Sequence, residues 1–314
     1  MKRIPFLIIS IIFSLTGRTQ NVPDSVSIQT DSLKKDSLII IADSSVKERP
    51  KTSQMEMGLS YQSNDVYLGR KDSSVLPYVI PEFTYYHKSG LYASASLNYL
   101  KNSTISRVDL VTLEAGYTFK KGQYDGQLSF SKYFYNSQST SVTSEISSSL
   151  AYQNGFDLGF IKPTFTATLN FGNKTDFATV LGLEHKFYLF DDQLDFTPTF
   201  AMSASTQNYY SDYFKKRRYT VKRGSKAGQT AIANITGTIP NASQFKILDY
   251  ESTIPVNYST GKWVFSFTPV YSIPVNPATV DIQTVKANGV ITNTTRVEKI
   301  SNTFYWTLEC SILF

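Results

Sequence analysis

Alternation of apolar and polar residues is the dominant pattern of this chain from about residue 54 onward. Segments of strand length recur in which every second side chain is apolar, as in strands with one face in an apolar environment. We expect strands at 54–63, 75–87, 91–100, 106–119, 124–135, 142–153, 156–170, 176–190, 194–208, 245–259, 262–275 and 302–314. The pattern therefore predicts an all-β domain of about twelve antiparallel strands.

The connections between these segments alternate between short and long. Short connections of turn-forming composition lie at Lys88-Ser89-Gly90, Lys120 to Gln123, Asn154-Gly155, Asp191-Asp192-Gln193 and Thr260-Gly261. Longer connections lie at 64–74, 101–105, 136–141, 171–175, 209–244 and 276–301. This arrangement is typical of an up-and-down transmembrane β-barrel. The alternation changes phase at Lys162 and Pro163, which a β-bulge or a misplaced strand boundary would explain.

The last segment divides most sharply into two faces. Phe304, Trp306, Leu308, Cys310, Ile312 and Phe314 share one face, and Tyr305, Thr307, Glu309 and Ser311 share the other. A closing strand that ends on Phe resembles the outer-membrane β-barrels of Gram-negative bacteria, in particular those of Bacteroidota. The resemblance covers about 54–314 and implies a porin-like barrel in the outer membrane, with both chain ends in the periplasm. The barrel assembly machinery would then recognise Trp306 and Phe314.

The first part of the chain lacks this alternation and is expected to stay outside the barrel at 53–314. Lys2 and Arg3 precede an apolar run from Ile4 to Leu15, which predicts a signal peptide over 1–19. Residues 20–52 are rich in Ser, Asp and Lys and predict a disordered periplasmic tail. Its apolar patch, Leu38 to Ile41, could add a strand to a partner's sheet or could be part of a plain tether.

The tail also holds three short triplets that bear on modification. Each triplet is Asp-Ser followed by Val or Leu, and the serines are Ser25, Ser32 and Ser37. The triplets resemble the O-glycosylation site of Bacteroidota. We therefore expect these three serines to be candidates for O-glycosylation.

Composition excludes several classes of protein. The chain has a single cysteine, so no disulfide framework exists, and after the N-terminal segment no apolar run is long enough for a helical membrane span. The formal charge of +6 is not organised into a basic, aromatic-rich recognition surface, so nucleic acid is not an expected partner. No metal-ligand spacing, phosphate loop or dinucleotide motif is present, and we expect no metal and no cofactor.

Catalytic patterns are also weak. The two histidines, His87 and His185, do not stand beside a serine and an acid as acyl transfer requires. Glu184 with Glu309, or Asp249 with Glu251, could converge as a carboxylate pair for hydrolysis, but such residues more often line a pore. We therefore do not expect an enzyme.

The polar faces of the predicted strands are mostly acidic. The residues expected to line the lumen and set selectivity are Glu82, Glu114, Glu145, Glu184, Asp249, Glu251 and Glu309, with Lys186 as a basic neighbour. Many carboxylates cannot be dry and charged together, so either water or basic groups must reach them. The long connection 209–244 supplies Lys215, Lys216, Arg217, Arg218, Lys222, Arg223 and Lys226. This basic loop could plug the lumen, contact lipopolysaccharide phosphates, or remain a solvated loop.

Two functions remain open at this point. The first is a passive channel for small polar or cationic solutes, with the acidic wall setting selectivity. The second is a non-conducting structural or interaction barrel, whose tail or basic loop recruits a periplasmic or surface partner.

Overall fold

The computed structural model describes residues 52–102, 105–216, 232–286 and 289–314. The predicted signal peptide (1–19), nearly all of the predicted tail and the serines Ser25, Ser32 and Ser37 lie outside these ranges. Arg217, Arg218, Lys222, Arg223 and Lys226 of the predicted basic loop lie outside them as well. No helix in the described ranges is long and apolar enough to cross a membrane.

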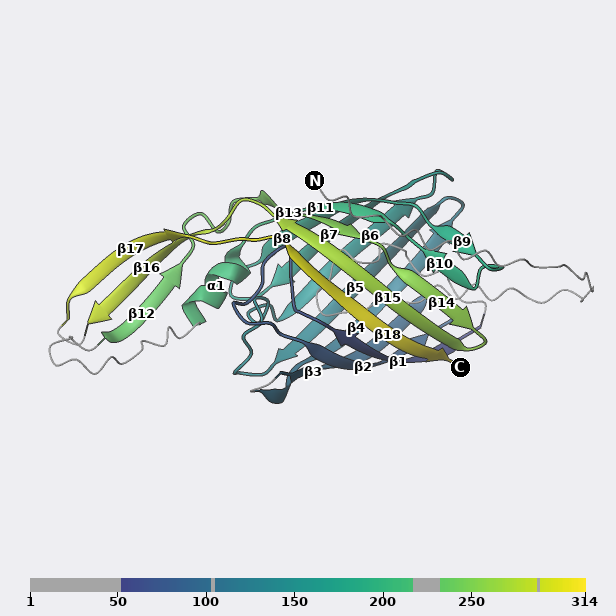
Figure 1. The fold of residues 1–314 in the computed structure, drawn as a ribbon, viewed down its shortest axis with the longest axis horizontal. Coiled ribbons are helices and arrows are strands. Elements are labelled where there is room, and N and C mark those ends of the chain that lie inside the picture. Colours follow the sequence, from purple (N-terminus) through teal and green to yellow (C-terminus); the bar gives the residue numbers. More distant parts are fainter. Residues whose placement is uncertain (1–51, 103–104, 217–231, 287–288) are drawn as a thin grey trace, which may run out of the picture. The chain divides into compact units, whose positions relative to one another are not determined.

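The described chain forms a closed antiparallel barrel of 12 strands (Figure 1). Seven strands follow one another along the chain: β1 (Gln54–Gln62), β2 (Tyr78–Tyr86), β3 (Leu91–Lys101), β4 (Ser106–Lys121), β5 (Tyr124–Tyr135), β6 (Ser148–Phe156) and β7 (Lys162–Phe171). The remaining five are β8 (Asp176–Glu184) continued by β9 (Phe187–Leu189), β10 (Leu194–Phe196) continued by β11 (Thr199–Ser205), β13 (Lys246–Thr253) continued by β14 (Val256–Thr260), β15 (Trp263–Pro274) and β18 (Thr303–Leu313). The predicted fold class and strand number are confirmed.

The barrel closes where β18 pairs with both β15 and β1. The backbone N–H of Phe314 donates to the carbonyl of Met55 over 2.9 Å, and Met55 N–H donates back to Phe314 over 3.2 Å. The first and last strands are therefore hydrogen-bonded to the end, and the barrel leaves no unpaired edge at this seam.

The two faces of the strands separate as the alternation predicts. Leu308 of β18 is 47% exposed and Phe314, the residue after this strand, is 56% exposed, while Tyr305 and Ser311 of β18 point inward and are each 1% exposed. Tyr85, Tyr117, Phe187 and Trp263 lie on the outer surface near the short turns, and Phe187 stacks on Phe196 with ring centroids 4.8 Å apart. An apolar outer wall with aromatics near its rim suits a lipid environment.

One predicted turn is wrong. Asn154-Gly155 lies inside β6, and the chain turns instead between β6 and β7, where Gly159 has a φ of 87°. Gly155 is needed for space: a Cβ at this position would lie 2.3 Å from Cε of the inward-pointing Lys162. The Asn-Gly pair at this position therefore leaves room for a neighbouring side chain and does not form a turn.

The predicted boundaries of the two strands at 142–153 and 156–170 are shifted. The structure begins β6 at Ser148 and β7 at Lys162, and the registers on both sides of β7 are unbroken, so no bulge occurs at Lys162 or Pro163. The misplaced boundary explains the phase change. Val142 and Ile146 are loop residues, but they are buried to 0% and 2% exposure. Apolar residues at these even-numbered positions give the loop the same alternation as a strand.

The barrel has two β-bulges among its described strands, both in the half that carries the long connections. The pairing of β3 with β4 shifts at Asn98/Tyr99 and leaves Asp109 as the extra residue, and that of β11 with β13 shifts at Ser203/Ala204 and leaves Leu248 extra. A bulge lets consecutive side chains turn to the same side. Asp109 with Leu110, and Leu248 with Asp249, are all buried inside.

The two longest predicted loops are also wrong in part, because they contain regular structure. Connection 209–244 contains α1 (Asn208–Lys216) and β12 (Ile232–Thr238), and connection 276–301 contains β16 (Thr279–Lys286) and β17 (Ile291–Val297). The three strands form a separate sheet in the order β12-β16-β17 (Figure 1). Only β16 has an apolar pair at alternating positions, Val280 and Ile282, and β17 has no buried residue, so the sequence pattern does not predict this sheet.

Candidate functional site

We call the barrel end with the long connections the mouth, and the other end the turn end. On the inner wall, most of the predicted lumen residues are where alternation places them. Glu82, Glu114, Glu184, Asp249, Glu251 and Glu309 all face inward. Glu145 does not, because it lies in the connection between β5 and β6 rather than on a strand. Six of the predicted wall carboxyls thus share one lumen.

Lys162 is the basic residue of the wall that sequence reasoning missed. Its Nζ lies 3.0 Å from Oδ2 of Asp125 and 3.3 Å from Oε1 of Glu184, joining strands β5, β7 and β8. The predicted basic neighbour, Lys186, lies in the gap between β8 and β9, with Nζ 3.6 Å from Oδ2 of Asp195. If the start of β7 is placed at Lys162, the alternation of inward and outward side chains along this strand predicts that Lys162 faces the lumen.

The remaining carboxyl groups of the wall accept hydrogen bonds mostly from hydroxyl groups. Glu114 accepts hydrogen bonds of 2.5 Å from Tyr92 Oη and from Ser131 Oγ. Ser272 Oγ bonds both carboxyl oxygens of Asp249, over 3.0 and 2.9 Å, and Tyr305 Oη donates to Glu251 over 3.2 Å. Hydroxyl groups of the wall thus hold these three carboxyl groups in place.

Part of the inner wall is only half-buried. Gln153 and Lys162 near the turn end belong to this part, as do Glu82, Thr307 and Glu309 farther along the barrel. Other inward residues near the turn end, such as Glu56, Tyr86 and Glu184, are buried. Charged side chains need contact with water or a close counter-ion. Polar side chains that are not fully buried therefore line part of the lumen.

The mouth is closed by packed side chains. We call the connection 63–77, the segment 142–146 and helix α1 together the mouth plug. Apolar members of all three are buried in one cluster with inner-wall residues such as Ala178 and Ala201. The plug therefore fills the barrel at this end, whereas sequence analysis had assigned a plugging role only to the basic loop.

The deepest part of the plug is a tight hairpin, Tyr67 to Arg70, which we call the plug tip. Tyr67 and Arg70 exchange two backbone hydrogen bonds of 2.8 Å, and Leu68 and Gly69 between them have φ values of 49° and 72°. Two successive positive φ values define a type I′ turn. Arg70, Tyr67 and Leu68 are among the largest fully buried side chains in the described part of the chain.

Arg70 ties the plug tip to distant parts of the chain. Its Nη2 donates to the carbonyls of Val275 over 3.0 Å and Asn276 over 2.8 Å, and its Nε lies 3.6 Å from Oε2 of Glu298. On the other side, Tyr67 Oη accepts a 2.8 Å hydrogen bond from Asn170 Nδ2 of β7. The plug tip is thus fixed both to β7 and to the chain that follows β15.

Helix α1 is held over the mouth by its N-terminus. Asp176 accepts from the backbone N–H of Asn208 over 2.8 Å and of Tyr209 over 2.7 Å, which satisfies free donors of the first turn. Tyr209 packs edge-on against Tyr67, with ring centroids 5.2 Å apart. Of the predicted basic loop, Lys215 lies in this helix and pairs with Asp212 over 2.7 Å, and Lys216 is the last helical residue.

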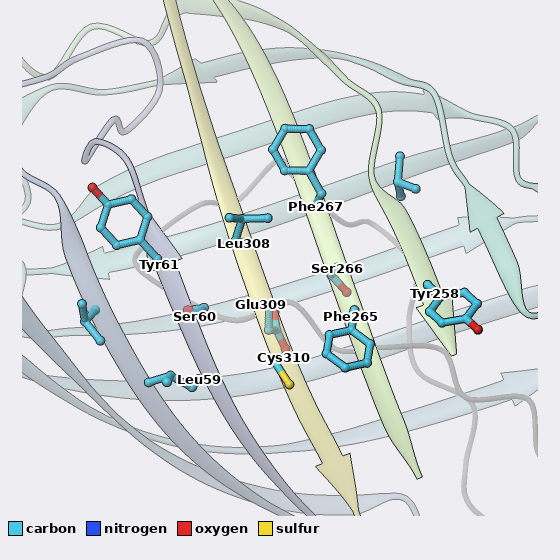
Figure 2. Close-up of a pocket in the computed structure, with 12 residues that line it drawn as sticks. Leu59, Ser60, Tyr61, Tyr258, Phe265, Ser266, Phe267, Leu308, Glu309 and Cys310 are labelled. Atoms are coloured by element: carbon cyan, nitrogen blue, oxygen red, sulfur yellow. The ribbon is translucent and has the colours of Figure 1, made fainter. Parts of the chain in front are cut away.

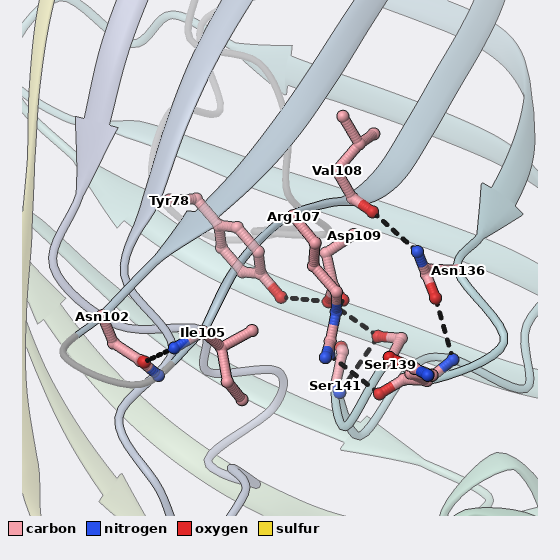
Figure 3. A network of polar contacts seen from close by, with 10 residues as sticks. Tyr78, Asn102, Ile105, Arg107, Val108, Asp109, Asn136, Ser139 and Ser141 are labelled. Carbon is pink, nitrogen blue, oxygen red and sulfur yellow. Dashed lines mark hydrogen bonds and ion pairs between the residues drawn. The ribbon is translucent and has the colours of Figure 1, made fainter.

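The bulge at Asp109 organises a second part of the mouth (Figure 3). Asp109 accepts 2.7 Å hydrogen bonds from Tyr78 Oη, Ser139 Oγ and Arg107 Nε. Arg107 Nη2 also donates to the carbonyl of Gln138 over 2.8 Å. One inward carboxylate thereby connects β2, β4 and the connection after β5.

Asp65 of the plug is expected to make the mouth sensitive to pH. Burial raises the pKa of this carboxyl to about 6, partly opposed by a hydrogen bond from Ser141 and increased by the nearby Asp109 and Asp72. Because the folded protein holds this proton more tightly than the unfolded chain, stability is greatest below about pH 4 and falls as the pH rises through about 6. The difference between this pKa and the ordinary value of 3.8 corresponds to a loss of about 3 kcal/mol in the free energy of unfolding over this pH range.

Thermal unfolding in detergent between pH 4 and pH 8 would measure this effect. Asp65→Asn should remove the loss of stability between about pH 4 and pH 6. Ser73→Asn, at an exposed position of the same connection, is a control that should keep it. An unchanged pH profile in Asp65→Asn would assign the dependence to other groups.

The outer wall carries an apolar groove of about 630 Å³ across β1, β18, β15 and β14 (Figure 2). Tyr61, Leu308, Phe265 and Phe267 line it, whereas Glu309 of β18 belongs to the opposite face of the same strand. Trp306, a predicted assembly residue, packs beside it with its ring 5.4 Å from Tyr61. The groove belongs to the apolar surface that a bilayer would cover.

Comparisons with known proteins give a likeness of fold. No family model matches the chain, and no curated protein matches it. Among solved structures, an outer membrane channel from Pseudomonas putida F1 has 8% identity and a TM-score of 0.41, covering 84% of this chain and 96% of that one. LpxR from Salmonella typhimurium has 8% identity and a TM-score of 0.41, covering 83% and 100%. The translocator domain of the autotransporter NalP from Neisseria meningitidis has 10% identity and a TM-score of 0.39, covering 84% and 89%.

Proposed function

We propose that this chain is an outer-membrane barrel that passes small polar or cationic solutes, and that the mouth plug closes it in the arrangement described above. The observation that carries the proposal is a polar inner wall beneath the mouth plug. Inward carboxyls in the middle of the barrel, such as Glu82 and Glu309, are half-buried. In the mouth half, the plug covers the wall, so that conduction requires movement of the plug.

Polar groups beneath the plug support this view. Asn98 Nδ2 and Oδ1, Thr168 Oγ1 and Ser203 Oγ lie in the mouth half and are buried without a hydrogen-bond partner among the described residues. A buried polar group without a partner costs about 1–3 kcal/mol. Movement of the plug would expose these groups to water and recover part of that cost. A polar wall beneath a removable cover is what a closed channel requires.

The charge of the wall favours cations. Inward carboxylates such as Glu82, Glu114 and Glu309 outnumber the basic residues Lys162 and Lys186 on the described part of the barrel wall. A surplus of carboxylates in a narrow, water-filled lumen attracts cations and repels anions.

Single-channel conductance in planar bilayers tests the proposal. The full-length barrel should be silent or open rarely, and a variant with residues 66–71 replaced by Gly-Ser-Gly should give stable, cation-preferring steps. Glu309→Gln in that variant should reduce the cation preference by removing a wall charge. Glu145→Gln is the matched control, because this carboxyl is not on the wall. If the excised variant is folded but silent, the channel proposal is wrong.

A second candidate is a non-conducting barrel that recruits a partner, and it is favoured by the sheet β12-β16-β17. All seven residues of its edge strand β17 are exposed, and an exposed edge strand can accept a further strand. Under this function, deletion of 279–297 or of the tail 20–52 should abolish partner capture on cells, and the intact protein should not conduct. Stable conductance of the intact protein, or partner capture that survives both deletions, would exclude it.

The outer-membrane setting implies further partners. We propose that lipid and lipopolysaccharide cover the apolar outer wall, and that the barrel assembly machinery recognises the strand ending at Phe314, which is 56% exposed. Both ends of the chain would then lie in the periplasm, where the tail could meet a partner. The predicted basic loop, of which Lys215 is already paired with Asp212, could contact lipopolysaccharide phosphates.

A further inference from the structure

A second cavity lies outside the lumen, between the plug and the small sheet. It has a volume of about 350 Å³ and is lined by the plug connection after its tip, by helix α1, by β16 and by the end of β17 with the residues that follow. This size is near the lower end of small-molecule sites in proteins. We call it the mouth pocket.

The two carboxylates of the mouth pocket are already engaged. Asp72 accepts from Ser74 N–H over 2.7 Å and from Tyr213 Oη over 2.5 Å. Glu298 accepts from Tyr210 Oη over 2.5 Å and from Ala278 N–H over 3.1 Å, and it also faces Arg70. The charge of Glu298 is therefore shared with Arg70, whereas the partners of Asp72 are neutral and leave one negative charge in the pocket.

Three cationic side chains line the same pocket: Lys71, Arg296 and Lys299. Lys71 Nζ donates to the neutral hydroxyl of Thr303 over 2.7 Å, and Arg296 and Lys299 are exposed. Within the described ranges, none of the three forms an ion pair with a carboxylate. The pocket therefore has a surplus of positive charge that can face a ligand.

The walls between these cations are apolar. Phe214 from α1, Val297 at the end of β17 and Ile300 line the pocket beside the basic groups. Apolar surface with a few convergent charged groups is the usual composition of a small-molecule site. It suits a ligand with a carbon ring and an anionic substituent, such as a sugar carrying a phosphate.

We propose that the mouth pocket binds a phosphorylated sugar, with Lys71, Arg296 and Lys299 around the phosphate and the apolar wall against the ring. A neighbouring cavity beside α1 is a useful contrast, because its Lys215 is paired with Asp212 over 2.7 Å and its lining is more polar. The phosphorylated sugar could be free in solution or part of a lipopolysaccharide headgroup. This proposal does not depend on whether the barrel conducts.

Titration calorimetry of the full-length protein in detergent tests the site, with glucose 1-phosphate as the probe and with glucose and inorganic phosphate as comparisons. Glucose 1-phosphate should bind at least about tenfold more tightly than either, because it uses both the charge and the apolar wall. Arg296→Gln with Lys299→Met should weaken it by about tenfold or more. Lys174→Met, in the neighbouring cavity, should leave it unchanged.

The outcomes separate the two ligand sources. Competition of glucose 1-phosphate by purified lipopolysaccharide, lost after enzymatic dephosphorylation of the lipid, would identify the headgroup. Lack of competition would identify a free phosphorylated sugar. Absence of saturable glucose 1-phosphate binding, or equal binding in the wild type and the double variant, would overturn the proposal.

Discussion

Gly69→Ala is expected to displace the plug tip and to turn a silent barrel into a conducting one. A Cβ at this position would lie 2.8 Å from Pro274 Cβ and 2.9 Å from Asp249 Cγ, closer than real Cβ atoms come. The backbone must also hold a φ of 72°, which costs an L residue about 1–2 kcal/mol. Both effects push the tip away from the inner wall, and planar-bilayer conductance would detect the result.

Gly122→Ala is the matched control for this prediction. Gly122 has a similar φ of 63°, but a Cβ there would meet nothing within 4 Å. The control therefore reproduces the backbone strain without the clash, and it should lose a little stability and remain silent. If both variants behave alike, close packing at Gly69 does not keep the mouth closed.

Arg70→Met is expected to have the second large effect, by releasing the plug from the chain that follows β15. Arg70 is 1% exposed, and its removal takes away two hydrogen bonds to backbone carbonyls and leaves Glu298 without its cation. Removal of one partner from a buried ion pair costs about 3–5 kcal/mol. We expect a lower thermal midpoint in detergent and rapid proteolytic cleavage within 63–77.

Lys101→Met is the control variant for Arg70→Met. Lys101 lies at the mouth end of β3, is exposed, and donates a single hydrogen bond of 2.9 Å to Ser106 Oγ. Its loss should change the midpoint little, as for most exposed residues. Equal protease resistance of Arg70→Met and the wild type would show that the plug holds without its arginine.

The barrel could be predicted from sequence because its signal is repeated in every strand. Residues such as Leu308 and Glu309 alternate between an apolar outer surface and a polar lumen, and the period of two leaves little ambiguity. The strand boundaries were less certain wherever loop residues were buried. Val142 and Ile146 continued the alternation into a loop, and Asn154-Gly155 imitated a turn while providing space for Lys162.

The plug could not be predicted in the same way. Its contacts join positions far apart in the sequence, such as Arg70 with Val275 and Tyr67 with Asn170, and no local pattern encodes such pairs. The apolar Val66 and Leu68 beside Gly69 were the available signal, since a solvated loop has little reason to carry them. The small sheet was missed because β17 has no apolar face.

The seam between β1 and β18 determines when this protein can fold. Ser311 Oγ donates to Glu56 across a sequence separation of 255 residues, and Arg70 reaches Asn276 across 206. Contacts of such separation form late and slowly, because the intervening chain must first be ordered. A nascent barrel without β18 has two open edges that can pair with other chains. The mouth can close only after the seam has formed, so we expect chaperones to be needed until the last strand arrives.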